Sequence, residues 1–156
     1  MDAIACEDTR HSKTLLNQYG IQKPLIATHE HNENESAQHL ITRLQKGERI
    51  ALITDAGTPA ISDPGARVVS AVREAGLRVI PIAGASAVVT ALSATGVDGA
   101  FAFVGFVTNK TGARAQVLAQ CNNCPAHLVF YGAPPRFHET LQALAEDSGD
   151  RNLTVA

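Results

Sequence analysis

Four short segments of the sequence combine acids, bases, glycines and hydroxyl groups, and each follows an apolar run. They are Glu7–Arg10, His29–Asn32, Asp55–Pro64 and Gly84–Ala87. In doubly wound α/β sheets, ligands bind beyond the carboxyl ends of the strands, where segments of this kind emerge. If the apolar runs are parallel strands, all four segments lie along one rim of the sheet. The sequence therefore predicts a ligand site at that rim.

The longest of these segments, between Ile53 and Gly65, is built from stiff and kinked backbone. Gly57 permits backbone angles that are closed to other residues, and Pro59 restricts Thr58 to an extended conformation. Such a loop presents its carbonyl and amide groups with little conformational entropy left to lose. We therefore expect it to bind a cofactor of mixed polar and apolar character rather than a bare phosphate.

The other segments also have purely structural interpretations. Asp8 can cap a helix, with Arg10 paired to an acid. His29 and His31 could share one face of a strand and bind a metal, but the sequence indicates no third ligand. Gly84–Ala87 offers backbone N–H groups at the start of a helix, which suit a carboxylate or a hydroxyl group.

The elements that position these segments alternate between β-rich runs and helical patterns, which is typical of an α/β protein. Strands are predicted over 1–6, 24–28, 50–54, 77–82, 100–107, 126–131 and 152–156. Helices are predicted over 8–19, from Asn34 or Ser36 to Gly47, and over 63–76, 86–93, 112–120 and 135–145. The strands of the first half are apolar on both faces, as a mostly parallel sheet covered by helices requires.

Composition limits the classes of function. The 156 residues are 45% hydrophobic, enough for a core, yet no run is long enough to span a membrane and no signal peptide is visible. The net charge of −2 gives no basic character overall, so nucleic-acid binding would depend on local groups. Three sparse cysteines suit a reducing cytoplasm. Cys121 and Cys124 follow a helix instead of opening one, which favours a structural role, and we predict no metal.

A polar stretch from Thr108 to Gly112 indicates a domain boundary. We expect residues 1–108 to form an N-terminal α/β domain that lacks its first strand. Residues 109–156 would begin a C-terminal α/β domain that is incomplete. Both ends of the chain read as truncated, because each carries a lone strand that requires a neighbouring strand or a partner chain.

Six motifs, in this order and spacing, resemble the tetrapyrrole methylase family of S-adenosylmethionine-dependent methyltransferases. They are ACEDTRHSKTLL, THEHNE, ALITDAGTPAISDPG, IAGASAVVTALSATG, FAFVGFV and LVFYGAPPRF. Within the family they are similar to the small-subunit ribosomal RNA methyltransferase I branch, which methylates the ribose 2′-oxygen of a cytidine in 16S rRNA. The motif DAGTPAISDPG is specific to that branch, whereas the general family pattern has a shorter Gly-Asp-Pro loop.

The resemblance implies two α/β domains, a homodimer, and S-adenosylmethionine as the methyl donor in a cleft between the domains. The donor would contact residues of three segments. They are Asp55, Ala56, Gly57, Thr58, Pro59, Ile61, Ser86, Ala87, Tyr131, Gly132 and Ala133.

The resemblance also implies 16S rRNA, within the small ribosomal subunit, as the partner of a cytoplasmic protein. Methyl transfer to a ribose hydroxyl needs alignment with the methyl group and help in losing the hydroxyl proton. The candidate catalytic residues at the rim are Asp8, His29 and Glu30. The candidate substrate-binding residues are Arg10, Asn32 and Arg67, with the two arginines placed to hold RNA phosphates.

The sequence departs from the family pattern at several places. The usual Pro-Gly-Pro-Ser reads Ala83–Ser86, and the usual Phe-Tyr-Glu reads Phe130–Gly132. The family's opening Thr-Pro-Ile-Gly-Asn-Leu loop and its later Arg-Glu-Leu-Thr-Lys motif are absent. Two alternatives stay open: methylation of a small molecule such as a tetrapyrrole, or a non-catalytic fragment that binds the donor or dimerises. The EDTR and HEHNE motifs match the RNA-directed branch and argue against the small molecule.

Overall fold

The structure, a computed structural model, describes residues 1–108, 110–148 and 152–156. The chain divides into two compact units, Met1–Ser86 and Ala87–Ala156. The domain boundary predicted after residue 108 falls inside the second unit, and it stays a prediction.

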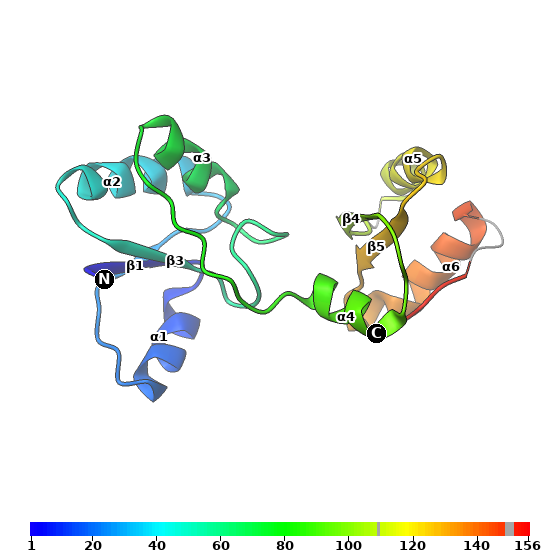
Figure 1. The fold of residues 1–156 in the computed structure, drawn as a ribbon, viewed down its shortest axis with the longest axis horizontal. Coiled ribbons are helices and arrows are strands. Elements are labelled where there is room, and N and C mark those ends of the chain that lie inside the picture. The colour runs from blue at the N-terminus through cyan, green and yellow to red at the C-terminus, as the bar shows by residue number, and fades with distance from the viewer. Residues whose placement is uncertain (109, 149–151) are drawn as a thin grey trace. The chain divides into compact units, whose positions relative to one another are not determined.

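The first unit is a parallel sheet with helices on both faces. Its elements are β1 (Ala3–Cys6), α1 (Thr9–Gln18), β2 (Leu25–Ala27), α2 (Glu33–Gln45), β3 (Ile50–Ile53) and α3 (Ala66–Glu74). The strand order is β2-β1-β3, and both pairings of β1 are parallel. Helix α1 covers one face of the sheet, and α2 and α3 lie side by side on the other (Figure 1). The predicted α/β class with a parallel sheet is confirmed.

The central strand β1 is buried on both faces, because successive side chains of a strand point to opposite sides. Ala5 contributes to a cluster with the buried apolar residues of α2 and α3, among them Leu40 and Val72. Ile4 and Cys6 pack on the other face against Leu16 of α1. Burial on both sides explains why the sequence of this strand is continuously apolar.

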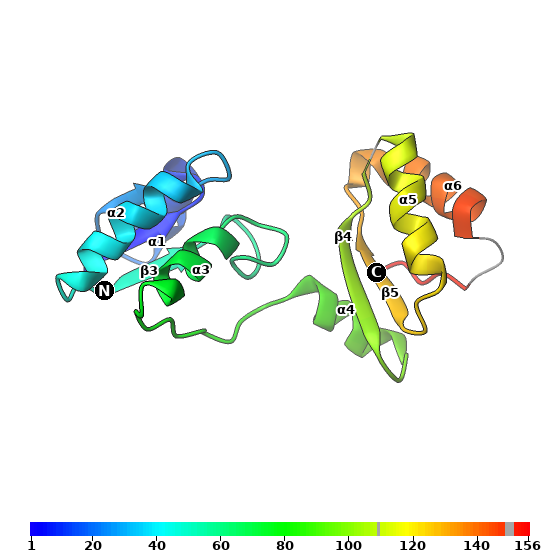
Figure 2. The ribbon, with the colours of Figure 1, turned by 90° about the horizontal axis from the view of Figure 1, so that it is seen from above.

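The second unit has a two-stranded parallel sheet of its own. Its elements are α4 (Ala87–Thr95), β4 (Phe101–Phe106), α5 (Thr111–Asn122), β5 (His127–Tyr131), η1 (Pro134–Arg136) and α6 (Phe137–Ser148). Helices α5 and α6 pack beside each other (Figure 2). The register between β4 and β5 shifts between Phe103 and Gly105, where Gly105 has a φ of +83°. Glycine adopts this angle without steric cost.

Two of the predicted strands are wrong. Residues 77–82 and 152–156 have no strand pairing in the structure. Both segments are rich in apolar and β-branched residues, but a strand forms only where a neighbouring strand accepts its backbone hydrogen bonds. Without that neighbour, Ile80 and Ile82 are 60% and 81% exposed, and Leu153 and Val155 are each 58% exposed.

Several helices begin at other residues than predicted, and α2 and α3 are the two that border the loops of the sheet edge. Helix α2 begins at Glu33, ahead of the predicted caps Asn34 and Ser36. Helix α3 begins at Ala66, because Pro64 still belongs to the preceding loop: its carbonyl accepts a hydrogen bond from the N–H of Ala60 at 3.3 Å. The loop after β3 is therefore longer than the Asp-Pro capping pattern indicated.

Truncation of a core side chain tests the packing of α2 against the sheet. Leu40 is 3% exposed, so we expect Leu40→Ala to lower the free energy of unfolding by about 2–5 kcal/mol. Leu15 on α1 is 48% exposed, and Leu15→Ala is the matched control, with an expected change below about 0.5 kcal/mol. Urea unfolding measures both. Equal effects of the two substitutions would contradict this assignment of the core.

Candidate functional site

The sheet of the first unit brings three of the predicted segments to one edge. Cys6, the last residue of β1, is in register with Ala27 at the end of β2 and with Ile53 at the end of β3. Because the strands are parallel, the loops that follow them emerge side by side. The chain moves from β1 to β2 on one side, while β3 lies on the other side of β1. Ligands of open α/β sheets bind beside such a reversal of strand order.

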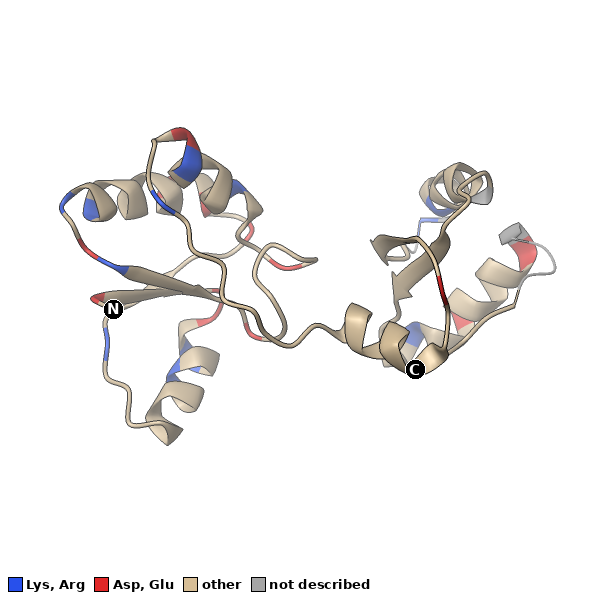
Figure 3. Cartoon of the chain, viewed as in Figure 1, with Lys and Arg blue, Asp and Glu red and all other residues tan. Residues whose placement is uncertain are grey.

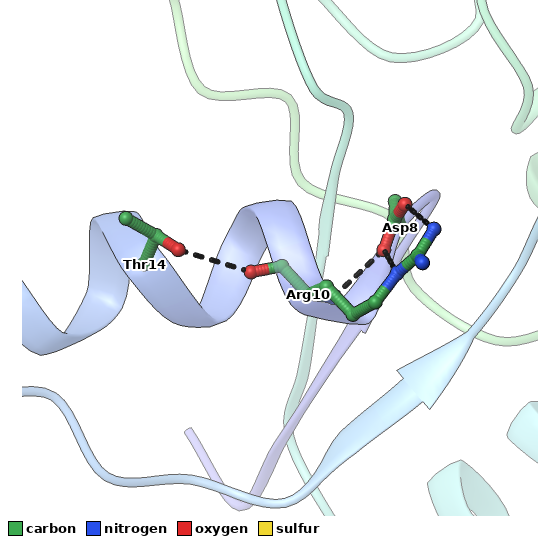
Figure 4. Close-up of polar contacts among 3 residues, drawn as sticks. All are labelled: Asp8, Arg10 and Thr14. Atoms are coloured by element: carbon green, nitrogen blue, oxygen red, sulfur yellow. Dashed lines mark hydrogen bonds and ion pairs between the residues drawn. The ribbon is translucent and has the colours of Figure 1, made fainter.

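Asp8 caps helix α1 and also holds Arg10. Its Oδ1 accepts hydrogen bonds from the backbone N–H of Arg10 at 2.8 Å and from the Nε of Arg10 at 3.2 Å (Figure 4). Its Oδ2 accepts from Nη2 at 2.8 Å. These bonds hold the pKa of Asp8 well below its usual range, which makes its carboxylate a weak base. The side chain of Arg10 remains 90% exposed and accessible to a phosphate.

Asn32 shapes the turn that follows β2. Its Oδ1 accepts a hydrogen bond from the backbone N–H of His29 at 2.8 Å, and its Nδ2 donates to the carbonyl of Ala27 at 3.1 Å. The hydroxyl group of Ser36 donates to the same carbonyl at 3.1 Å. The side chains of His29 and Glu30 are exposed on this turn. The side-chain amide of Asn32 thus stabilises the turn. Its predicted contact with the substrate would have to be made while these hydrogen bonds are kept.

The loop between β3 and α3 turns back on itself. Gly57 has a φ of +77°, and Ala60 and Ser62 have φ values of +70° and +66°. Residues other than glycine rarely adopt this region, and holding them there costs energy that the surrounding structure must offset. The sequence indicates an unusual conformation at Gly57 alone, because nothing in the residue types of Ala60 and Ser62 predicts a positive φ.

The donor-binding candidates of the first unit are accessible to different degrees. Asp55, Ala56, Gly57 and Ile61 are exposed, whereas Thr58, Pro59 and Ser86 are half-buried. The Oγ1 of Thr58 donates a hydrogen bond to the carbonyl of Ala85 at 3.2 Å. This hydrogen bond connects the loop after β3 to the fourth predicted segment, Gly84–Ala87. The residue that it reaches, Ala85, directly precedes the donor-binding candidate Ser86.

Two acidic side chains, Asp55 and Asp63, interact at the rim between β1 and β3. Partial burial raises the pKa of Asp63, and the nearby carboxylate of Asp55 raises it further. Burial likewise raises the pKa of the Cys6 thiol, and the charges of Asp55 and Asp8 add to that rise. A cationic ligand at this place would offset the repulsion between the carboxylates of Asp55 and Asp63.

The remaining donor-binding candidates lie in the second unit. Tyr131 is the last residue of β5, and its ring lies edge-on to Phe103, with 4.8 Å between the ring centroids. Gly132 is exposed, and a Cβ built there would lie 3.8 Å from Phe137. Ala133 caps the short helix η1. Ala87 opens α4 and is exposed.

Glu33 is a buried charge that the sequence analysis did not single out. Its side chain is 6% exposed, and its Oε2 lies 3.8 Å from the Nε of Arg67, one of the predicted phosphate ligands. Its Oε1 accepts a hydrogen bond from the backbone N–H of Gly65. An acid in the first turn of a helix is usually an exposed partner of the helix dipole, so its position gave no signal of burial.

Among residues 1–108, 110–148 and 152–156, no three His, Cys, Asp or Glu side chains lie together as metal ligands. His29 and His31 stand edge-on, with their ring centroids 6.1 Å apart. Within the same residues, no helix is both long enough and apolar enough to cross a membrane.

The sheet also carries a cavity of about 630 Å³ away from the rim. It lies where α1 ends and β2 begins, and it is lined in part by Lys13, Asn17, Lys23 and Pro24. That is the amino end of the strand, opposite to the loops described above.

Basic and acidic residues are interspersed along the described chain (Figure 3). With a net charge of −2, recognition of a polyanion would depend on particular side chains.

Comparison with known proteins identifies the family. The family of tetrapyrrole (corrin/porphyrin) methylases matches residues 1–156. The chain belongs to this family. That membership confirms the resemblance drawn from the six motifs, and it agrees with a ligand-binding rim at the carboxyl ends of parallel strands.

The curated relatives that the chain matches carry the name ribosomal RNA small subunit methyltransferase I. The relative from Haemophilus influenzae is 46% identical over 156 residues, which are 99% of this chain and 55% of that protein. The relative from Mesorhizobium japonicum is 47% identical over 156 residues, 99% of this chain and 53% of that protein. The relative from Bacillus subtilis is 44% identical, with the same two shares. The chain thus spans about half the length of these relatives.

The titration of Asp8 tests the geometry at the start of α1. Its hydrogen bonds to Arg10 lower its pKa below the ordinary value of 3.8, so the stability it contributes is present above that value and is lost as the pH falls. Arg10→Ala should move the titration midpoint of Asp8 back toward 3.8 in carbon-detected NMR. Lys13→Ala removes a charge from the same helix and should leave the midpoint unchanged. An unchanged midpoint in Arg10→Ala would show that the ion pair does not form in solution.

Proposed function

We propose that the protein transfers a methyl group from S-adenosylmethionine to the ribose 2′-oxygen of a cytidine in 16S rRNA of the small ribosomal subunit. The observation that carries this proposal is the shared rim: three polar loops leave adjacent parallel strands in a chain of the methylase family. The names of the curated relatives support ribosomal RNA as the substrate. Because the chain spans about half of those relatives, the proposal concerns the whole protein.

The loop after β3 fits the methyl donor. S-adenosylmethionine supplies a methyl group on a positively charged sulfonium, and it also carries an ammonium group and an adenine ring. The carboxylates of Asp55 and Asp63 repel each other, so a nearby cation would stabilise both. Ile61 is 45% exposed and offers apolar surface to the adenine ring of the donor. Gly57 leaves the backbone open to close approach, since a Cβ there would meet only Asp63, at 3.8 Å.

The loops after β1 and β2 suit the RNA. Arg10 is exposed at the rim and can hold a backbone phosphate, which would position the ribose. The hydroxyl proton needs an acceptor. The lowered pKa of Asp8 makes its carboxylate a weak base, so its role would be to orient Arg10. We assign proton acceptance to His29, with Glu30 beside it, because both are exposed on the adjacent turn and histidine is the side chain most often used as a general base.

Separate substitutions at the two loops test the proposal. Arg10→Ala should weaken RNA binding and reduce the log–log slope of affinity against salt by about one, because one phosphate contact is lost. Its donor affinity, measured by calorimetry, should stay nearly unchanged. Arg73→Ala is the control, because Arg73 is exposed in the last turn of α3, at the opposite end of the strands. If Arg10→Ala left both the RNA affinity and its salt dependence unchanged, Arg10 would serve only as the partner of the capping residue Asp8.

Gly57→Val should have the reverse effect, with weaker donor binding and nearly unchanged RNA binding. A β-branched side chain at a φ of +77° would strain the loop and crowd the donor. Gly47→Val is the matched control: Gly47 has a φ of +87° at the end of α2, and no atom lies within 4 Å of a Cβ built there. If both valine variants lost donor binding equally, backbone strain and not contact with the donor would be the cause. If the unaltered protein bound NAD or ATP more tightly than S-adenosylmethionine, the assignment of the donor would be wrong.

We infer that the protein works as a homodimer in the cytoplasm, where ribosomal subunits are modified. Among the described residues, no strand pairs with the outer edges of β2 and β3, and Ile80 and Ile82 are exposed beyond α3. Unpaired edges and apolar side chains favour association between chains. Sedimentation equilibrium at micromolar concentration should detect a dimer. A single species with the mass of one copy of the whole protein would exclude it.

A further inference from the structure

Glu33 carries a charge in a place where charge is costly. It is the first residue of α2 and is 5% exposed. A carboxylate removed from water to this extent destabilises the fold unless hydrogen bonds or opposite charges compensate it. The partners that compensate Glu33 therefore indicate what the residue is for.

Both partners of Glu33 lie at the far end of the loop after β3. Its Oε1 accepts the backbone N–H of Gly65, the capping residue of α3. Its Oε2 lies 3.8 Å from the Nε of Arg67, whose side chain is 68% exposed. The bond to Gly65 is buried, whereas the ion pair to Arg67 is long and open to solvent, so the N–H of Gly65 is the principal partner.

The backbone at Gly65 is confined on its other side as well. Its φ is +129°, and a Cβ built there would lie 3.1 Å from the Cδ2 of Leu52 on β3. The preceding residue, Pro64, accepts a hydrogen bond from the N–H of Ala60 at 3.3 Å. The loop is thus held by β3 at its start and by Glu33 at its end, with its turn closed in between.

Glu33 also follows directly on the turn after β2, which carries His29 and Glu30. The bond to Gly65 therefore joins the loop proposed to serve the donor to the turn proposed to serve the RNA. We propose that Glu33 is a positioning residue: by holding Gly65, it keeps the donor loop in the shape that binds S-adenosylmethionine. This inference rests on the proposed function, because it assigns the same loop to the same donor.

Three substitutions of Glu33 separate positioning from simple stability. Glu33→Gln keeps an oxygen that can accept the N–H of Gly65, so donor affinity should stay within about threefold of the unaltered protein. Glu33→Ala removes the acceptor and should weaken donor binding by about tenfold or more. Glu33→Asp keeps the charge but is one methylene shorter, and it should behave like the alanine variant. Calorimetry with S-adenosylmethionine measures all three, with melting temperatures recorded alongside.

Glu35→Ala is the matched control, because Glu35 is an exposed acid in the same first turn. It should leave donor binding unchanged. The inference is overturned if Glu33→Ala and Glu33→Asp bind the donor within about twofold of the unaltered protein, or if Glu33→Gln loses as much affinity as Glu33→Ala. A purely structural residue would lower the melting temperature in all three variants without this pattern in affinity.

Amide hydrogen exchange at Gly65 supplies a second readout that needs no donor. The amide should exchange faster in Glu33→Ala and Glu33→Asp, and at the original rate in Glu33→Gln. Equal exchange in all variants would overturn the positioning role. If the unaltered protein bound no S-adenosylmethionine, the proposed function would fail by itself, and the exchange rates would still decide whether Glu33 holds the loop.

Discussion

The parallel register of three strands is the constraint on which the candidate site depends. Cys6 lies level with Ala27 and with Ile53, so the loops after β1, β2 and β3 leave the sheet at one edge. That register is maintained by β1, which is buried on both faces between α1 and the pair α2 and α3. A shift of one residue would turn its side chains to the wrong faces and would also offset the loops.

Much of the polarity at this edge serves the fold before it serves any ligand. Asp8 accepts the backbone N–H of Arg10, and Asn32 closes the turn after β2. What these bonds leave exposed is the guanidinium of Arg10 and the side chains of His29 and Glu30. Structural and functional interpretations of one motif are therefore compatible, because a satisfied cap holds its neighbours where a substrate can reach them.

The two strands that the sequence predicted and the structure lacks have a common physical cause. Residues 77–82 and 152–156 carry the apolar, β-branched pattern of strands, but a strand also requires a partner for its backbone groups. The pattern reports the side-chain preference of a segment and contains no information about its neighbours. The helices were predicted more closely, since their hydrogen bonds lie within the segment, and the errors are of one to three residues at their two ends.

The sequence by itself determined the α/β class, the family motifs, and the stiffness of the loop around Gly57 and Pro59, because each follows from residue types at short range. The tertiary structure alone decided that Glu33 is buried, that it binds the N–H of Gly65, and that Ala60 and Ser62 adopt positive φ angles. These features depend on contacts between α2, α3 and β3, which are distant in the chain. Such features cannot be predicted from the local sequence. In a different packing of the helices, the same residues could be exposed to solvent and could adopt ordinary backbone angles.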